Sequence, residues 1–310
     1  MDVTTKRFLG ECKSSKDWCR ISEDPADLPN ADAVLFHNAD YMPGQAATIK
    51  RNTTIPFVIW SLESPQHDHF RPEPNTINWT MTYRKDADVW YPYGHIIKRE
   101  KPIEVDLDAI WAMKKKTATW LASNCLTSNF RLPLIEKLEE AGVETERWGR
   151  CGNPPPGCDG VDKQGYDCVA TLIKPYKFYM AFENSNCVDY VTEKFYETMR
   201  TRMAVPLVIK RRTYENLGIP GDSFIALDDY KNAQEMAAHV IAIANNKTAY
   251  LEYHQWRREY EVIPEHHDLT GFCSLCRKLR EGGFPSKSYG NLNEWHEKNK
   301  CDPSYTRRFL

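Results

Sequence analysis

Short apolar runs recur along the first part of the chain, and each ends in polar residues. Residues 33–36 and 56–60 are apolar and predict two buried strands. His37 to Asp40 follow the first strand, and Ser61 to Ser64 follow the second. In an open α/β sheet, ligands bind beyond the carboxyl ends of the strands. These two polar segments are therefore candidate parts of a functional site.

The second part of the chain alternates between strand and helix patterns. Residues 117–122 and 143–148 predict strands around a helix that starts near Pro133 and stops at Gly142. The other predicted strands cover residues 176–182, 205–209 and 224–227, with helices starting near Thr192 and Asn232. This alternation predicts an α/β fold with a doubly wound, mainly parallel sheet. A change in composition at residues 98–116 predicts a first domain over residues 1–115 and a second over 116–272.

Composition narrows the class of protein. Hydrophobic residues make up 41% of the 310 residues and aromatic residues 12%, which is enough for substantial cores. The net charge of -2 argues against nucleic acid or a membrane surface as the main partner, because both require a concentrated basic face. The basic run Lys114 to Lys116 is interpreted as a solvated segment.

Ten cysteines favour an oxidising compartment. Cys273 and Cys276 have zinc-ligand spacing, but no second short-spaced pair completes such a site, so disulfides are the other reading. N-glycosylation sequons begin at Asn52, Asn78 and Asn246 and favour a lumenal chain. No apolar stretch approaches the ~20 residues that span a bilayer. For a lumenal chain we therefore expect a catalytic fragment whose targeting segment lies outside it.

The segment from Tyr176 to Lys194 carries the most informative chemistry. A hydrophobic strand leads into a polar loop, and Thr192 is a plausible cap for the following helix. Glu193 could accept hydrogen bonds from sugar hydroxyls, and Lys194 could neutralise a phosphate. The alternative is an ordinary capped helix with no ligand.

The same segment resembles the motif of α1,3-fucosyltransferases in glycosyltransferase family 10. The matching residues are Phe182-Glu183-Asn184-Ser185, then residues 189–194, then Val205-Pro206. Further blocks of the family resemble residues 60–65, 81–94, 123–131, 149–150, 219–225 and 272–276. The resemblance covers residues 31–279 well, and the additional cysteines are similar to those of invertebrate members.

The resemblance implies a fold and a set of residue roles. The fold is the GT-B architecture, with two Rossmann-like doubly wound domains facing a cleft, and GDP-fucose is the donor. Arg131 and Lys194 would bind the diphosphate, and Glu193 would hold the ribose. The candidate pocket residues around nucleotide and fucose are Asn184 and Tyr190. Glu63 would be the general base that accepts the proton of the acceptor hydroxyl.

The resemblance also implies an inverting transfer of L-fucose to the 3-OH of a GlcNAc in a glycan. The acceptor GlcNAc could lie in the core of an N-glycan or in an antenna. The implied location is the Golgi lumen, as the catalytic domain of a single-pass type II membrane protein. Asp86 and Asp88 form a D-x-D pattern, but the GT-B architecture does not need one. No obligatory metal is expected, and stimulation by Mn²⁺ is left open.

Other parts of the chain carry further expectations. By the same resemblance, Cys273 and Cys276 would bridge back to the region of Cys12 and Cys19, and residues 273–310 would pack on the first domain. Residues 210–212, which replace a small turn, are interpreted as a solvated loop. Three alternatives remain: an inactive glycan-binding homologue, a transferase for another sugar nucleotide, and fucose transfer to a polypeptide.

Overall fold

The chain forms two compact units. The computed structural model describes residues 3–10, 12–49, 55–158, 167–265, 267–282, 287–298 and 300–310. One unit comprises Met1–Tyr93 and Pro264–Cys301, and the other Gly94–Ile263 and Asp302–Leu310. The first boundary therefore lies earlier than residue 115. The reason is that β5 (Gly94–Lys98) pairs with β11 (Tyr260–Pro264), and α2 (Leu107–Met113) packs against α8 (Lys247–Glu252).

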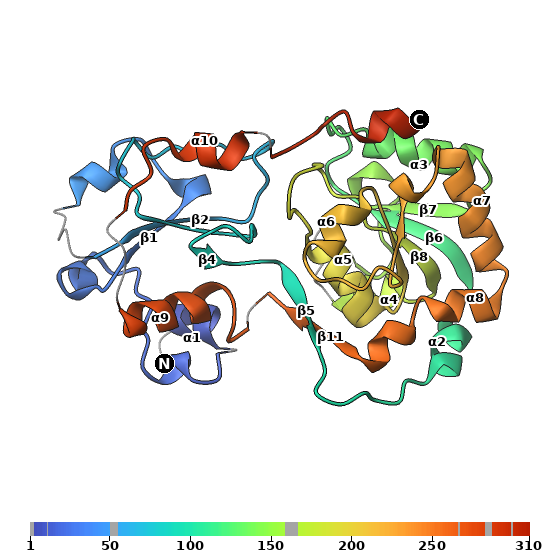
Figure 1. Cartoon of the computed structure of the whole chain (residues 1–310), viewed down its shortest axis with the longest axis horizontal. Helices are drawn as coiled ribbons and strands as arrows, with labels where there is room; N and C mark the ends of the chain where they lie inside the picture. The colour runs from blue at the N-terminus through green and yellow to red at the C-terminus, as the bar shows by residue number, and fades with distance from the viewer. Residues whose placement is uncertain are drawn as a thin grey trace. The chain divides into compact units, whose positions relative to one another are not determined.

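The first unit is built on a four-stranded parallel sheet. Its order is β1-β2-β3-β4, formed by Val34–His37, Phe57–Ser61, Trp79–Thr82 and Val89–Trp90. Alternate residues of β2 face opposite sides, so Val58 packs toward α1 (Val3–Leu9) and α9 (Gly271–Glu281). Phe57 and Ile59 pack with Leu292 of α10 (Leu292–Glu297). Figure 1 shows α10 on one side of this sheet and α1 with α9 on the other. The two strands predicted at residues 33–36 and 56–60 are confirmed.

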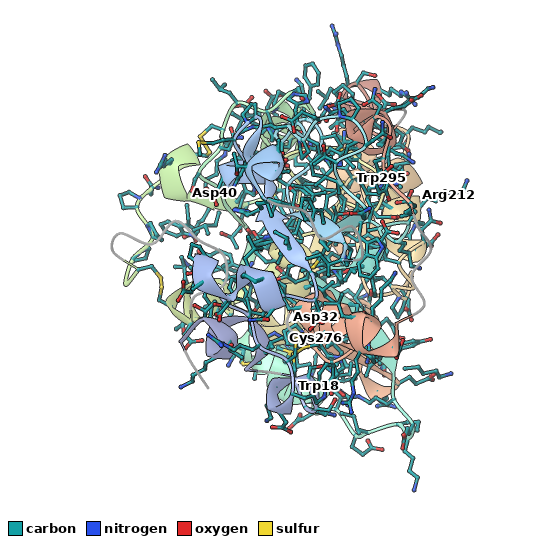
Figure 2. All side chains as sticks on the ribbon, turned by 90° about the vertical axis from the view of Figure 1, so that its left-hand side faces the viewer. Trp18, Asp32, Asp40, Arg212, Cys276 and Trp295 are labelled. Atoms are coloured by element: carbon teal, nitrogen blue, oxygen red, sulfur yellow. A yellow bond between two sulfur atoms is a disulfide. The ribbon has the colours of Figure 1, made fainter. Side chains whose placement is uncertain are left out.

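Disulfides attach α9 to the start of the chain. Cys12 pairs with Cys273, and Cys19 pairs with Cys276, with Cα atoms 5.7 and 6.1 Å apart. The bridges expected from the resemblance are confirmed, and the zinc alternative is wrong because both sulfur atoms are used. Arg280 belongs to α9, like Cys276, and its guanidinium lies 4.6 Å from the centre of the Trp18 ring. Trp18 and Cys276 are labelled in Figure 2. Closing such long loops restricts the unfolded chain.

The second unit is built on a five-stranded parallel sheet of order β10-β9-β8-β6-β7. In chain order the strands are β6 (Lys116–Leu121), β7 (Thr145–Trp148), β8 (Tyr176–Met180), β9 (Val205–Val208) and β10 (Ile225–Ala226). Phe178 and Met180 face α3 (Arg131–Glu140) and α7 (Ala233–Ala244), which pack together. Tyr179 faces the other way, toward Arg202 at 4.8 Å. The predicted doubly wound parallel sheet is confirmed (Figure 1).

The pairs Cys125–Cys151 and Cys158–Cys168 cross-link the segment around α4 (Asp167–Ile173). Two local expectations need correction, one for residues 210–212 and one for Lys114. Residues 210–212 are not a loop, since they open α6 (Arg211–Glu215). Arg211 is anchored there by an ion pair with Asp229 at 2.5 Å.

Lys114 is buried rather than solvated. Its ammonium group donates to the carbonyl oxygens of Lys174 at 2.8 Å and Arg202 at 3.0 Å. Arg202 ends the π-helix Thr198–Arg202, which continues α5 (Glu193–Glu197), and the end of a helix leaves carbonyl groups without partners. Burial and the nearby Arg257 lower the pKa of Lys114 to about 7. The sequence, a run of three lysines, did not indicate that Lys114 is buried.

In the part of the chain that the structure describes, no helix combines the length and apolar character needed to cross a bilayer.

The two sequons that the structure describes differ in how accessible their asparagines are. Asn78 is half-buried, and its side-chain amide donates to the carbonyl oxygen of Lys287 at 2.6 Å and accepts from the amide of Phe57 at 2.9 Å. Asn246 is exposed and caps α8 through its side-chain oxygen, which accepts from Ala249 at 3.1 Å. A glycan on the nitrogen of Asn246 leaves that oxygen in place. The sequon at Asn52 lies outside the described residues.

We expect one glycan at Asn246 and none at Asn78 when the chain is secreted from eukaryotic cells. Intact mass before and after glycosidase treatment measures this. Asn246→Gln should remove one glycan mass, while Asn78→Gln should leave the mass of the attached glycans unchanged. A secreted, folded protein that carries its glycan at Asn78 would contradict the prediction.

The buried histidine of α10 predicts a pH dependence of stability. His296 donates from Nε2 to the carbonyl oxygen of Asp68 at 3.2 Å. Its Nδ1 has no hydrogen-bond partner among the described residues. Burial, helped by the charge of Arg84, lowers the pKa of His296 to about 4. In the unfolded chain the histidine titrates near 6.5.

The unfolded state therefore binds the extra proton first, and the free energy of unfolding should fall as the pH drops from 6.5 to 4. At 1.36 kcal/mol per pH unit, this histidine contributes up to about 3 kcal/mol of that loss. Urea unfolding of wild type and His296→Gln at several pH values measures the slope. The slope should flatten in His296→Gln and stay unchanged in His67→Gln, a matched change at an exposed histidine.

Candidate active site

Two loops meet at the carboxyl end of the sheet in the second unit. One follows β6 and leads into α3 at Arg131, and the other follows β8. Arg131 is 2% exposed and donates to the carbonyl oxygens of Phe182 at 3.0 Å and Asn124 at 2.5 Å. Arg131 thus holds the two loops together, because its guanidinium bonds a backbone carbonyl in each.

The loop after β8 is closed by Glu183. This buried carboxylate accepts from the backbone amide of Thr192 at 2.7 Å and from its hydroxyl at 2.8 Å. The ammonium group of Lys194 lies 3.4 Å from the same carboxylate. Thr192 caps α5, as predicted, by accepting from the amide of Lys194 at 3.4 Å. Glu183 therefore holds the cap and the cation in one arrangement.

Lys194 is the centre of the charge in this loop. Its ammonium group also lies 3.2 Å from the carboxylate of Glu193 and donates to the hydroxyl of Thr192 at 2.9 Å. Burial opposes its charge, but the carboxylates of Glu193 and Glu183 outweigh burial and raise its pKa. Arg131 is close enough to act in the other direction, so the structure brings Arg131, Glu193 and Lys194 together.

The two carboxylates respond differently to this environment. Burial raises the pKa of Glu183, although Lys194 opposes the effect. For Glu193 burial also acts upward, but Lys194 and hydrogen bonds overcome it and lower the pKa. Lys194 thus faces two acids and is already engaged by their carboxylates before any ligand is considered.

Asn184 and Tyr190 belong to the same loop. Asn184 is half-buried and follows Glu183 directly, whereas Tyr190 is buried and precedes Thr192 by two residues. The positive φ of Asp189, 59°, turns the chain just before Tyr190. All five candidate residues of the second unit therefore lie in the loop after β8 or in the first turn of the helices, α3 and α5, that follow β6 and β8.

Glu63 lies in the first unit, two residues beyond the end of β2. It is half-buried, and its Oε1 accepts from the amide of Ser64 at 2.7 Å. The loop is fixed by the hydroxyl of Tyr93, which donates to the carbonyl oxygen of Leu62 at 2.7 Å. His37, the last residue of β1, stacks on Trp60 of β2 with ring centroids 4.2 Å apart. The polar segments after β1 and β2 are therefore neighbours.

The two carboxylates of the D-x-D pattern form ion pairs with cationic side chains of the first unit. Asp88 pairs with Lys287 and accepts from the hydroxyl of Tyr289 at 2.8 Å. Asp86 pairs with Arg84 and lies 3.9 Å from Lys300. Their negative charge is thus already compensated, which does not fit a metal ligand pair. In the residues that the structure describes, no group of three or more His, Cys, Asp or Glu side chains could hold a metal ion.

Comparison with family models decides the class of this protein. The model for the C-terminal part of glycosyltransferase family 10 (fucosyltransferase) matches residues 111–295. The model for the fucosyltransferase N-terminal part matches residues 2–94. The chain belongs to glycosyltransferase family 10. This confirms the resemblance that the sequence motifs indicated, and with it a glycosyltransferase enzyme.

Curated relatives agree with this family 10 assignment. The chain is 48% identical to the alpha-(1,3)-fucosyltransferase fut-6 of Caenorhabditis elegans, over 99% of this chain and 80% of the relative. It is 36% identical to the alpha-(1,3)-fucosyltransferase fut-5 of the same organism, over 98% of this chain and 82% of the relative. The expectation of an invertebrate-like family 10 member is confirmed.

A solved structure supports the fold of this family 10 chain. The crystal structure of an alpha1,3-fucosyltransferase with GDP-fucose matches it with a TM-score of 0.54. The match covers 84% of this chain and 80% of the other, at 14% sequence identity. At this identity the likeness shows the fold alone, and it confirms the expected fold class.

Sequence reasoning assigned no role to Glu183. Its motif was recognised, but a glutamate after a strand does not reveal that its carboxylate returns to the cap nine residues later. The available signal was the combination of an acid at the end of a buried strand with Thr192 and Lys194 downstream, since a buried acid needs partners.

Proposed function

We propose that this family 10 chain is an inverting α1,3-fucosyltransferase. It transfers L-fucose from GDP-β-L-fucose to the 3-OH of a GlcNAc in a glycan of the Golgi lumen. The single observation that carries the proposal is the match of both family models across nearly the whole chain. The names of the relatives and the GDP-fucose complex of the solved structure support the choice of donor and linkage.

In the proposed mechanism, Glu63 accepts the proton of the acceptor hydroxyl as that oxygen attacks the anomeric carbon of fucose. A bond forms between this oxygen and the anomeric carbon while the bond to the GDP oxygen breaks. Direct displacement inverts the anomeric carbon, so a β-linked donor yields an α-linked product. The half-buried carboxylate after β2 supports this role for Glu63.

The departing GDP gains negative charge, which Arg131 and Lys194 stabilise in this proposal. Glu193 holds the ribose, and Asn184 and Tyr190 shape the pocket. The proximity of Arg131, Glu193 and Lys194 supports a shared site. Because Lys194 is engaged by Glu183 and Glu193, a diphosphate must compete with these carboxylates for it. No metal takes part in the steps proposed here.

The deciding experiment is incubation with GDP-fucose and a mixture of defined N-glycans, followed by linkage analysis of the product. Fucose on the 3-position of a GlcNAc supports the proposal and names the acceptor as core or antenna. Binding of GDP-fucose without transfer to any glycan favours an inactive glycan-binding homologue. Transfer to a deglycosylated polypeptide, or from another sugar nucleotide only, would replace the proposal with those alternatives.

A further inference from the structure

A buried polar network lies beneath the loop that carries Glu63. Asp68 is at its centre and is 9% exposed. Its Oδ2 accepts from the hydroxyl of Ser61 at 2.6 Å, and its Oδ1 accepts from the side-chain amide of Asn38 at 2.7 Å. Ser61 and Asn38 are 2% and 0% exposed. A carboxylate bonded to buried donors is held in one geometry, because losing either bond leaves a polar group unsatisfied.

Ser61 links this network to Glu63. The hydroxyl of Ser61 donates to Asp68, so its oxygen is oriented to accept a hydrogen bond from another group. The backbone amide of Glu63 donates to that oxygen at 3.2 Å. A two-step path therefore runs from the Asp68 carboxylate, through one hydroxyl, to the peptide that carries the proposed base.

Asp68 is in turn held by α10. Asn293 pairs with the backbone of Phe70 in both directions, with bonds of 2.8 and 2.7 Å. His296 donates to the carbonyl oxygen of Asp68 at 3.2 Å. Trp295, labelled in Figure 2, stacks with Phe70 and lies 4.1 Å from the guanidinium of Arg84. The C-terminal helix of the first unit therefore fixes the backbone from which Asp68 reaches Ser61.

We propose that Asp68 is a positioning residue that acts through Ser61 to hold Glu63 in its reactive orientation, with α10 as its support. The inference rests on the proposed role of Glu63 as general base. A general base must lie within hydrogen-bond reach of the proton that it accepts, and small displacements of a catalytic group are costly. Neither Asp68 nor Ser61 needs to touch the substrate.

The test is a double-mutant cycle between Ser61→Ala and Glu63→Gln, assayed with radiolabelled GDP-fucose and the acceptor identified above. Ser61→Ala should lower kcat about 10- to 100-fold and leave the KM for GDP-fucose unchanged. If Ser61 acts through Glu63, the double variant should be no slower than Glu63→Gln alone, because the two losses are not additive. Ser61→Thr, which keeps the hydroxyl, should restore most of kcat.

Two further variants separate positioning from folding. Asp68→Asn should lower kcat in parallel with Ser61→Ala, which keeps the inference testable if one variant is unstable. Thr80→Val is the matched control, because Thr80 is a buried residue of the same sheet whose hydroxyl bonds the carboxylate of Asp88 at 3.2 Å. Thr80→Val is expected to lower thermal stability and leave kcat unchanged.

Each outcome of the cycle is decisive. Full activity in Ser61→Ala, with Glu63→Gln inactive, would overturn the positioning role and leave the base in place. A double variant slower than Glu63→Gln by the full Ser61→Ala factor would show that Ser61 acts independently of Glu63 and would also overturn it. Wild-type activity in Glu63→Gln would remove the proposed base, and the positioning role would fall with it.

Discussion

Glu63→Gln is expected to lower kcat by roughly 10²–10⁴ while GDP binding stays unchanged. The amide has nearly the shape of the carboxylate, and its oxygen can keep the hydrogen bond from Ser64 that Oε1 accepts at 2.7 Å. The substitution therefore removes the proton acceptor and preserves the loop. Steady-state rates with GDP-fucose and titration calorimetry with GDP measure the two effects separately.

Glu73→Gln is the matched control for this prediction. Glu73 belongs to the same unit and also accepts from a backbone amide, that of Gly44 at 2.5 Å, as well as from the hydroxyl of Tyr41. It is exposed, and we assign it no role in the reaction. We expect wild-type kcat in this variant. A kcat for Glu63→Gln within about threefold of wild type would show that another group accepts the proton.

Lys194→Ala is expected to reduce kcat/KM by roughly 10²–10³, because it removes the cation that stabilises the departing diphosphate in the proposed mechanism. GDP binding should weaken by about 10- to 100-fold, as for a lost charged hydrogen bond. The same change leaves the buried carboxylate of Glu183 without its cation at 3.4 Å. Breaking such a pair costs about 3–5 kcal/mol of stability. Activity and unfolding must therefore be measured together.

A second substitution separates the two effects of losing Lys194. Glu183→Gln in the Lys194→Ala background neutralises the buried charge, and a glutamine oxygen can still accept from Thr192. Stability should recover in this double variant, whereas GDP affinity should not. Lys116→Ala is the control, because its ion pair with Glu146 lies at the amino end of β6 and is exposed. Native GDP affinity in the double variant would remove Lys194 from the phosphate site.

The local pattern of the sequence was sufficient for the strands and for the main helices of the second unit. Residues 56–60 and 176–182 predicted strands because a fully buried parallel strand is a continuous apolar run bounded by polar residues. The helix beginning after Asn232 was equally visible, since its cap and its apolar stripe lie within twelve residues. Such signals depend only on neighbouring residues, so the sequence contains them in full.

The candidate site was only partly visible in the sequence. Motif resemblance identified Glu63, Arg131, Asn184, Tyr190, Glu193 and Lys194. The structure pairs Lys194 with Glu193 and places Arg131 near enough to lower the pKa of Lys194. Their roles remain predictions. The hydrogen bond from Arg131 to the carbonyl group of Phe182 could not be anticipated, because it joins residues 51 positions apart.

The sequence by itself determined the family, the parallel α/β class and the residues available for chemistry, because each is encoded in short motifs and local periodicity. The tertiary structure alone decided how those residues are held. It closed Glu183 onto Thr192, buried Lys114 at the end of a π-helix and set α10 against the loop of Glu63. These contacts depend on burial and on chain segments that meet only after folding. Neither can be predicted from the local pattern of a single sequence.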